Sequence, residues 1–270
     1  MTLLTEPTRI VLAKGYTLPD DADAVAYIAA VEAADGQPLE TATRMAINSF
    51  VKGCKADGIW PALKASCILA GARTLAGALV PLVGTAPTNF NFVSGDYNRK
   101  TGLVGNGTSK YLDSNRNNNA DPQDSQHLAI YISQTATSGA VAFPAYIGAG
   151  SSFTGSSVIG RLSNNGNVYT RSRCALASSA VSGSATGLLG ISRSTTLVYA
   201  TRSNATSATV TQSSQAPRNV SIAVFRDLDS PGDTTANARL AFYSIGESLD
   251  LARLDSRVTD LINAFAAAIP

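Results

Sequence analysis

The chain has little of the chemistry on which most enzymes depend. Its 270 residues include one histidine and one tryptophan, and only 7% of the residues are aromatic. General acid–base catalysis most often uses histidine, so His127 is the one histidine that could serve as a general acid or base. Cys54, Cys67 and Cys174 form an odd set without CxxC spacing, which argues against a secreted disulfide scaffold and favours reduced, buried thiols. This composition favours a protein that is not an enzyme.

Charge and long apolar runs are also scarce. Charged residues make up 15% of the chain, and 21 basic against 19 acidic side chains leave a net charge of +2. A nucleic-acid partner requires a concentrated basic face, but the longest basic run is Arg99-Lys100, so we expect none. The longest apolar stretch, residues 68–83, is interrupted by Arg73 and falls short of the roughly 20 residues of a membrane span. Residues 1–7 lack the features of a signal peptide, and we expect no membrane insertion.

Motifs for metals and cofactors are incomplete. Asp227-Leu-Asp229 begins like a calcium loop, but Pro231 and Ala238 stand where an EF-hand needs oxygen ligands. An Asp-rich turn is the simpler interpretation, and a calcium site of another kind on a sandwich rim is the alternative. The histidine and cysteines form no zinc cluster, and residues 102–107 lack the Lys-Ser/Thr pair and helix of a phosphate-binding loop. We expect no cofactor and no metal.

Catalytic constellations are equally weak. His127 is accompanied by no G-x-S-x-G elbow and no paired cysteine, so we interpret it as a hydrogen-bonded structural histidine. Glycoside hydrolysis needs only two carboxylates across a cleft, which keeps it as a minor alternative. Its candidates, none spaced as an evident pair, are Asp96, Asp113, Asp121, Asp124, Asp227, Asp229 and Asp233.

The first part of the chain predicts helices. Over residues 20–35 an acidic run precedes apolar residues at helical spacing, and a glycine and a proline follow. The same spacing predicts a second helix over residues 39–57. A third helical stretch is predicted from Trp60 through Leu69.

From Thr85 to Leu240 the chain becomes rich in Ser, Thr, Asn and Gly, and short β-branched segments alternate with turn residues. This pattern predicts about eight to ten strands of a sandwich or barrel. The expected strands are 127–133, 141–147, 156–162, 167–171, 188–192, 196–202, 208–212, 219–226 and 239–245. The segment Asn115–Pro122 is polar and turn-prone, so we expect a surface loop.

A closing helix is predicted after Gly246, with Ser248 as its N-cap and apolar residues at helical spacing from Leu251 to Phe265. The predicted fold class is mainly β with α. Residues 1–84 form an N-terminal arm and helical region, residues 85–247 an antiparallel β-sandwich, and residues 248–270 a helix that packs on the preceding parts.

Four short motifs follow one another along the chain. They are Phe50-Val-Lys-Gly-Cys-Lys-Ala-Asp-Gly-Ile-Trp-Pro-Ala-Leu63, Gly102-Leu-Val-Gly-Asn-Gly-Thr-Ser-Lys-Tyr-Leu-Asp113, His127-Leu-Ala-Ile-Tyr131 and Phe242-Tyr-Ser-Ile-Gly-Glu-Ser-Leu249. In this order they resemble tailed-bacteriophage virion proteins that carry a laminin-G-like, or concanavalin-like, jelly-roll domain. The similarity covers most of residues 40–268.

The resemblance implies a structural component of a virion, made in the host cytoplasm, that displays a jelly roll on the particle surface. Host-surface adhesion at a tail fibre or tail tip is the leading function, and capsid decoration that stabilises the head is the alternative. A polysaccharide-degrading enzyme is the minor alternative, because such virion proteins are mostly non-catalytic. Other virion proteins and copies of the chain, in a trimer or another symmetric assembly, are the expected partners.

Candidate ligand residues lie near the opening motif of the jelly roll. Aromatic rings stack on sugar rings and polar side chains bind hydroxyl groups, so a host glycan would be held by Tyr97, Arg99, Tyr111 and Arg116. The alternative is that the tyrosines pack and the arginines are solvated. Residues 1–19 match no motif, and we interpret them as an extended arm that docks on a neighbouring subunit.

Overall fold

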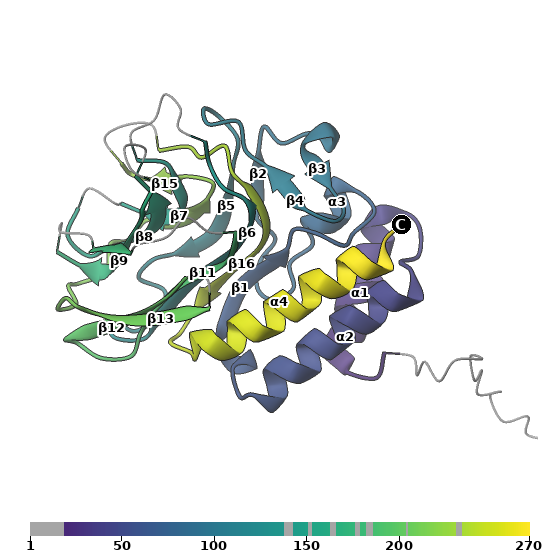
Figure 1. Ribbon diagram of the computed structural model, residues 1–270, viewed down its shortest axis with the longest axis horizontal. Helices are drawn as coiled ribbons and strands as arrows, with labels where there is room; N and C mark the ends of the chain where they lie inside the picture. The colour runs from purple at the N-terminus through teal and green to yellow at the C-terminus, as the bar shows by residue number, and fades with distance from the viewer. Residues whose placement is uncertain are drawn as a thin grey trace, which may run out of the picture.

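The computed structural model describes residues 19–137, 143–150, 153–162, 166–175, 179–181, 186–203, 205–230 and 234–270. Two eight-stranded sheets lie face to face, and helices cover one of them (Figure 1). Sheet A has the order β13 (Thr206–Thr211), β12 (Val198–Ser203), β11 (Gly187–Arg193), β6 (Gln126–Gln134), β16 (Arg239–Gly246), β4 (Gly102–Val104) and β3 (Tyr97–Asn98), and β1 (Leu63–Ile68) also pairs with β16.

Sheet B completes the sandwich. Its order is β10 (Ser179–Val181), β9 (Val168–Cys174), β8 (Ser156–Arg161), β7 (Ala145–Ala149), β14 (Ser221–Val224), β5 (Tyr111–Asn117) and β2 (Thr88–Phe90), with β15 (Asp227–Leu228) paired to β7. Apart from the parallel pair of β15 and β7, the paired strands run antiparallel. Residues 141–142 of one predicted strand lie outside the described residues, and β7 begins at Ala145.

The helices are α1 (Ala22–Asp35), α2 (Thr41–Ala56), α3 (Leu75–Ala78) and α4 (Leu251–Ala268), with short 3₁₀ turns η1 (Trp60–Ala62) and η2 (Ser94–Asp96). The predicted helices over 20–35 and 39–57 are confirmed as α1 and α2. The Asp21 carboxylate caps the first turn of α1, and Gly36 ends the helix in the left-handed conformation. The predicted fold class, helices before and after a β-sandwich, is confirmed.

Strand β6 shows why its sequence is apolar without interruption. Leu128, Ile130 and Ile132 belong to the core between the sheets, while Ala129 belongs to the core under the helices. Both faces of the strand are covered, so the hydrophobic run replaces the alternation of a half-exposed strand. Strand β6 therefore contributes side chains to both hydrophobic cores.

Helix α4 packs on sheet A and against α2, as Figure 1 shows. Its buried stripe includes Leu254, Val258 and Phe265, in agreement with the predicted apolar spacing. Ser248 is not its N-cap, and that prediction is wrong. The Asp250 carboxylate instead accepts hydrogen bonds from the backbone nitrogens of Ala252 and Arg253, at 2.8 and 3.2 Å.

The third predicted helix, residues 60–69, is wrong. Only η1 is helical, and β1 follows it and pairs with the C-terminal half of β16, where Cys67 lies opposite Tyr243. An Ala-containing hexapeptide is compatible with either state, and tertiary pairing decides between them. The predicted helical region 1–84 therefore contributes a strand to the sandwich.

The prediction that Asn115–Pro122 forms a surface loop is also wrong for the first half of the segment. Strand β5 extends to Asn117, with Asn115 in the left-handed conformation at φ 56°. Asn118 is fully buried, and its side-chain amide donates to the carbonyl oxygen of Gly155 at 2.9 Å. Asn118 therefore fastens the end of β5 to the start of β8, while Asn115 and Asn117 are exposed.

Candidate functional site

Tyr97 and Arg99 join the helical region to the sandwich. The Tyr97 hydroxyl donates to the carbonyl oxygen of Ala72 at 2.7 Å, and Arg99 Nε donates to the same oxygen at 3.0 Å. The Arg99 guanidinium also binds both carboxylate oxygens of Glu40, at 3.1 and 2.8 Å, and lowers the pKa of that carboxyl to about 2. Both predicted site residues therefore have structural partners on the segments that lead into and out of the helices.

Arg116 lies on β5 and forms an ion pair with Asp121, which is itself buried. Its Nε donates to Asp121 Oδ2 at 3.2 Å. This contact closes the turn that follows β5 and places the arginine away from Tyr97 and Arg99, which belong to the β3 side of sheet A.

Tyr111 belongs to an aromatic cluster on sheet B. Phe90 of β2 lies directly opposite Tyr111 of β5, and their rings stack with centroids 4.3 Å apart and planes 6° apart. The Arg226 guanidinium carbon lies 5.3 Å from the centroid of the Tyr111 ring, within the range of a cation–π contact. We call Phe90, Tyr111 and Arg226 the aromatic platform.

The aromatic platform faces outward from the sandwich. Leu112, the next residue along β5, is fully buried in the core between the sheets, so side-chain alternation turns Tyr111 and Asp113 toward the outer face. Tyr111 is half-buried and also packs against the edge of that core. Thr88 lies opposite Asp113 on the same face, and the Phe90 side chain is 37% exposed. Apolar rings and polar groups therefore share one surface.

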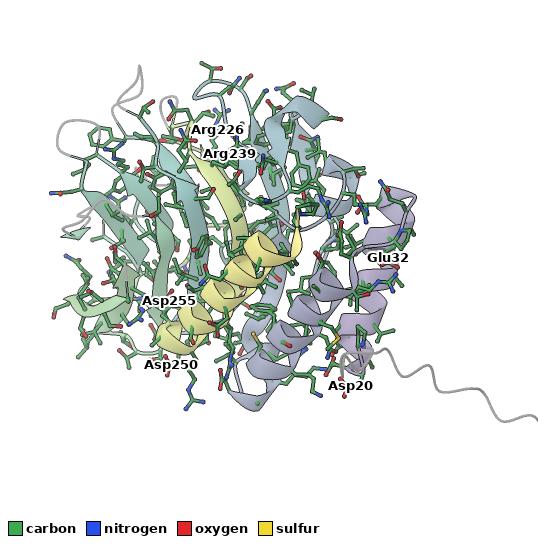
Figure 2. All side chains as sticks on the ribbon, turned by 45° about the vertical axis from the view of Figure 1, so that its right-hand side comes forward. Asp20, Glu32, Arg226, Arg239, Asp250 and Asp255 are labelled. Carbon is green, nitrogen blue, oxygen red and sulfur yellow. The ribbon has the colours of Figure 1, made fainter. Side chains whose placement is uncertain are left out.

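Arg226 is the charged member of the platform. Within the described residues no carboxylate forms an ion pair with it, and its Nε is buried without a hydrogen-bond partner. Figure 2 shows Arg226 at the end of the molecule opposite Asp250, the cap of α4. An unpaired guanidinium beside stacked rings can donate hydrogen bonds to a hydroxylated or anionic ligand.

Sequence reasoning identified only Tyr111 of these three residues. In a regular strand Phe90 and Phe92 would point to the same face. Strand β2 ends at Phe90, however, and Asn91 is in the left-handed conformation at φ 67°, so Phe92 is buried against Phe225 while Phe90 stays exposed. The sequence therefore carries no local signal that separates the exposed ring of Phe90 from the buried ring of Phe92. Arg226 is distant in sequence and carries no local signal, because only the pairing of β14 with β5 brings its neighbourhood to Tyr111.

His127 is a structural residue, as predicted. It is fully buried, with Nδ1 2.6 Å from the carbonyl oxygen of Glu247 and Nε2 2.8 Å from Ser244 Oγ. Burial lowers the pKa of His127 to about 4, so the imidazole is neutral near pH 7. The side chain fastens β6 to β16 and to the chain that leads into α4.

The lowered pKa predicts acid-sensitive folding. In the unfolded chain His127 has a pKa near 6.5 and takes up a proton below that pH, whereas the folded histidine stays neutral until the pH nears 4. The stabilisation that the neutral, buried His127 provides is therefore fully present above pH 6.5 and is lost as the pH falls toward 4. We expect His127 to account for a loss of about 3 kcal/mol in the free energy of unfolding between pH 7 and pH 4. Urea unfolding at both pH values, compared with His127→Gln, isolates this contribution from that of the carboxyl groups. Equal pH dependence in both proteins would contradict the assignment.

The cysteines are buried and free, which confirms the prediction of three reduced thiols. Burial raises the pKa of Cys54 and of Cys67 to about 12. Both thiols therefore remain protonated at neutral pH, and thiolate is the form that a nucleophile or a metal ligand requires.

The candidate carboxylates have local partners. Three form ion pairs: Asp96 with Lys110, Asp121 with Arg116 and Asp229 with Arg218. Asp113 accepts from Ser221 Oγ, and Asp124 accepts from Thr196 Oγ1 at 2.8 Å. Asp227 is buried on β15, while Asp233 lies outside the described residues. In the described ranges no group of three or more His, Cys, Asp or Glu residues could hold a metal ion.

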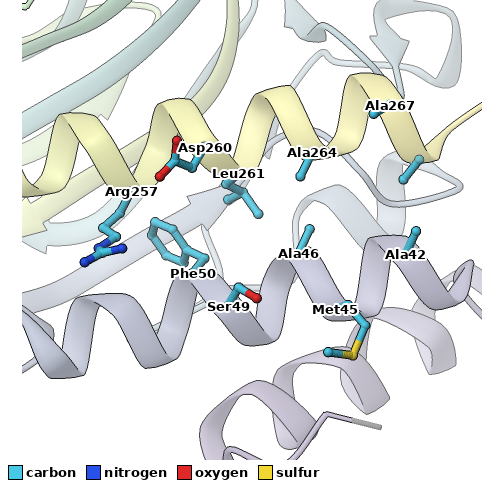
Figure 3. Close-up of a pocket in the computed structure, with 11 residues that line it drawn as sticks. Ala42, Met45, Ala46, Ser49, Phe50, Arg257, Asp260, Leu261, Ala264 and Ala267 are labelled. Atoms are coloured by element: carbon cyan, nitrogen blue, oxygen red, sulfur yellow. The ribbon is translucent and has the colours of Figure 1, made fainter. Parts of the chain in front are cut away.

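A groove with a volume of about 540 Å³ lies between α2 and α4 (Figure 3). Its walls carry Ala42, Ala46, Ala264, Ala267 and Ala268, together with Met45, Ser49, Phe50, Arg257, Asp260 and Leu261. Arg257 is already engaged by Asp57, with Nε 2.7 Å from the carboxylate. The groove follows from small side chains where two helices meet and offers a mainly apolar lining. Among the helices that the structure describes, none is long and apolar enough to cross a membrane.

No family model and no curated protein matches this sequence. Among solved structures, the chain is similar to the binding domain of botulinum neurotoxin serotype D, at 12% identity and a TM-score of 0.48 over 74% of this chain and 51% of that one. The binding domain of botulinum neurotoxin serotype D/C VPI 5993 matches at 13% identity and a TM-score of 0.39, over 60% of this chain and 43% of that one. A Trypanosoma rangeli sialidase mutant displaying trans-sialidase activity matches at 10% identity and a TM-score of 0.45, over 81% of this chain and 39% of that one.

The chain spans about half the length of the toxin binding domain that it matches, and less of the sialidase. Two of these three similar structures are binding domains and one is an enzyme. Likeness at this level of identity and TM-score carries no argument about function. The function of this chain has to be inferred from its own residues.

Proposed function

We propose that this chain is a non-catalytic structural component of a bacteriophage virion, which displays its β-sandwich on the particle surface and binds a host-surface glycan. The observation that supports glycan binding is the aromatic platform, in which stacked Phe90 and Tyr111 lie beside Arg226, a guanidinium with no ion-pair partner among the described residues. The four ordered motifs, which resemble tailed-bacteriophage virion proteins, support the location on a virion. Of the four residues predicted from the sequence, the proposal retains Tyr111.

The chemistry of the platform matches that of a sugar. A pyranose has an apolar face of C–H groups and a rim of hydroxyls, and the exposed part of Phe90 supplies an apolar surface for the first. Arg226 supplies hydrogen-bond donors for the hydroxyl groups. Thr88 and Asp113 lie on the same face of the sheet. An open platform on an outer sheet face suits a sugar within a long surface polysaccharide, because the interior of such a chain cannot enter a closed cavity.

Loss of the platform is expected to abolish binding without unfolding the protein. The full-length chain is applied to an array of bacterial surface glycans, and bound sugars are then measured by titration. We expect Phe90→Ala and Arg226→Gln each to weaken binding at least tenfold, an effect typical of residues that dominate an interface. Val93→Ala, which changes another exposed apolar side chain nearby, is the matched control and is expected to bind normally. Unchanged binding by both platform variants, or no bound sugar for the parent chain, would reject the site.

Capsid decoration remains the second candidate, and one surface favours it. The outer side of α1 exposes Ala22, Val25, Ala26, Ala29 and Ala33, so this helix presents an almost uncharged face. Such a face suits an interface with another virion protein. Antibody labelling of intact particles separates the two roles: label at the tail supports adhesion, and label over the head supports decoration. A chain absent from purified particles would reject the virion proposal while leaving the glycan test intact.

A further inference from the structure

Strand β13 is an unprotected edge of sheet A. It pairs with β12 on one side, and across the described part of the chain no strand pairs with its other side. Its six residues, Thr-Ser-Ala-Thr-Val-Thr, include no charge and no proline, and all but the half-buried Val210 are exposed. In Figure 1 the β12–β13 hairpin forms the lower left border of the molecule, away from α1 and α2.

The other sheet edges are much shorter or are covered. Strand β3 has two residues, and β2 and β10 have three each. The free side of β1 is covered by the chain around Val83, whose carbonyl oxygen accepts from the backbone nitrogen of Ser66 at 3.0 Å. Folded proteins protect long edges with charges, prolines or bulges, because the free backbone groups of an edge pair readily with another strand. Among the described edges, β13 is long and has none of these protections.

We propose that β13 pairs with β13 of a second copy of this chain, antiparallel and across a two-fold axis, so that the two A sheets become one continuous sheet. A second copy is the favoured partner because two uncharged, β-branched strands meet without like charges opposite one another. Each copy offers the same patch to the other, as a closed two-fold interface requires. The pairing leaves the aromatic platform free, since the platform lies on sheet B.

A neighbouring apolar side chain supports this interface. Leu197 is 65% exposed at the start of β12, and its carbonyl oxygen accepts from the backbone nitrogen of Gln212, just beyond the end of β13, at 3.0 Å. A shallow pocket of about 290 Å³ lies nearby on sheet A, lined by Val198, Ala200 and Thr209 together with Ser192, Ser194 and Ser248 among others. The exposed Leu197 therefore lies beside the free edge, where a second strand would cover it.

Charge placed on the edge tests the proposal. Sedimentation equilibrium of the full chain is expected to show a dimer, and Thr209→Lys is expected to weaken dimerisation at least tenfold because two ammonium groups meet near the axis. Ser256→Lys, which adds the same charge to an exposed position on α4, is the matched control and leaves the dimer intact. A parent chain that is monomeric at all concentrations, a trimer, or a dimer insensitive to Thr209→Lys would overturn the proposal.

Single cysteines provide a second, independent measurement. The three natural cysteines are buried, so an added cysteine on β13 is the accessible thiol among the described residues. A two-fold axis requires one residue of the strand to face its own copy. Of Ser207→Cys, Ala208→Cys and Thr209→Cys, one is therefore expected to form a disulfide-linked dimer under mild oxidation, and Ser256→Cys is expected to form none. Equal cross-linking at every position would indicate random collision and overturn the two-fold arrangement.

Discussion

Replacing Arg173 by leucine is expected to lower the free energy of unfolding by about 4 kcal/mol. The side chain is fully buried on β9, and its guanidinium donates to the backbone carbonyl oxygens of Asn118, Pro122, Gln123 and Ser125. Leucine fills part of the space but leaves these carbonyls without their donor, and an unsatisfied buried acceptor costs about 1–3 kcal/mol. The segment between β5 and β6 then loses its attachment to sheet B.

Urea unfolding followed by circular dichroism measures this effect. Arg253→Leu is the matched control, because Arg253 is 54% exposed and its ion pair with Asp250 is a surface pair that contributes at most about 0.5 kcal/mol. Burial lowers the pKa of Arg173 to about 10, which leaves the guanidinium charged at neutral pH and able to hold all four carbonyls. An Arg173→Leu protein within 1 kcal/mol of the parent, an interval of the same order as a single hydrogen bond, would show that these bonds are not what closes the turn.

Gly102→Ala is expected to lower the free energy of unfolding by at least about 3 kcal/mol, because of left-handed backbone strain and overpacking. Gly102 begins β4 at φ 94°, and an added Cβ would meet the carbonyl oxygen and carbon of Leu240 on β16 at distances that real side chains do not adopt. Backbone atoms of a central strand cannot move aside as a flexible side chain can. The pairing of β4 with β16 must therefore separate.

Gly36→Ala is the comparison that isolates the steric part of this cost. Gly36 also has a positive φ of 67°, but an added Cβ meets nothing within 4 Å. We expect a loss of about 1 kcal/mol there, which represents backbone strain alone. If thermal unfolding shows equal losses for the two variants, close approach of β4 to β16 is not the reason for glycine at position 102.

The parts of the fold that were predictable are those whose signals are local. The helix over 20–35 carries its own cap in Asp21 and its own stop in Gly36, and α4 carries a long apolar stripe. Strand β6 is apolar throughout because it is covered on both faces. Strand β1 was missed because its hydrogen bonds go to β16, at the far end of the chain, and no local pattern records that pairing.

The candidate site was less predictable for a related reason. The opening motif identified Tyr111, but it also pointed to Tyr97, which lies nearby in sequence and on the other sheet. In this part of the chain β3 and β4 belong to sheet A and β5 belongs to sheet B, so residues close in sequence lie on different sheets. Phe90 and Arg226 reach Tyr111 only through strand pairing and through the turn that follows β14.

The position of β16 has a consequence for how the protein is made. It lies in the middle of sheet A, between β6 on one side and β1 and β4 on the other, yet it is the last strand along the chain. During synthesis the earlier strands leave the ribosome before their central partner exists, so sheet A cannot close until translation has passed Gly246. Folding must then join segments far apart in sequence, which makes it slow and exposes unpaired strands to aggregation in the meantime. We therefore expect nascent chains stalled before residue 239 to depend on chaperones, and chains extended through α4 to be released from them.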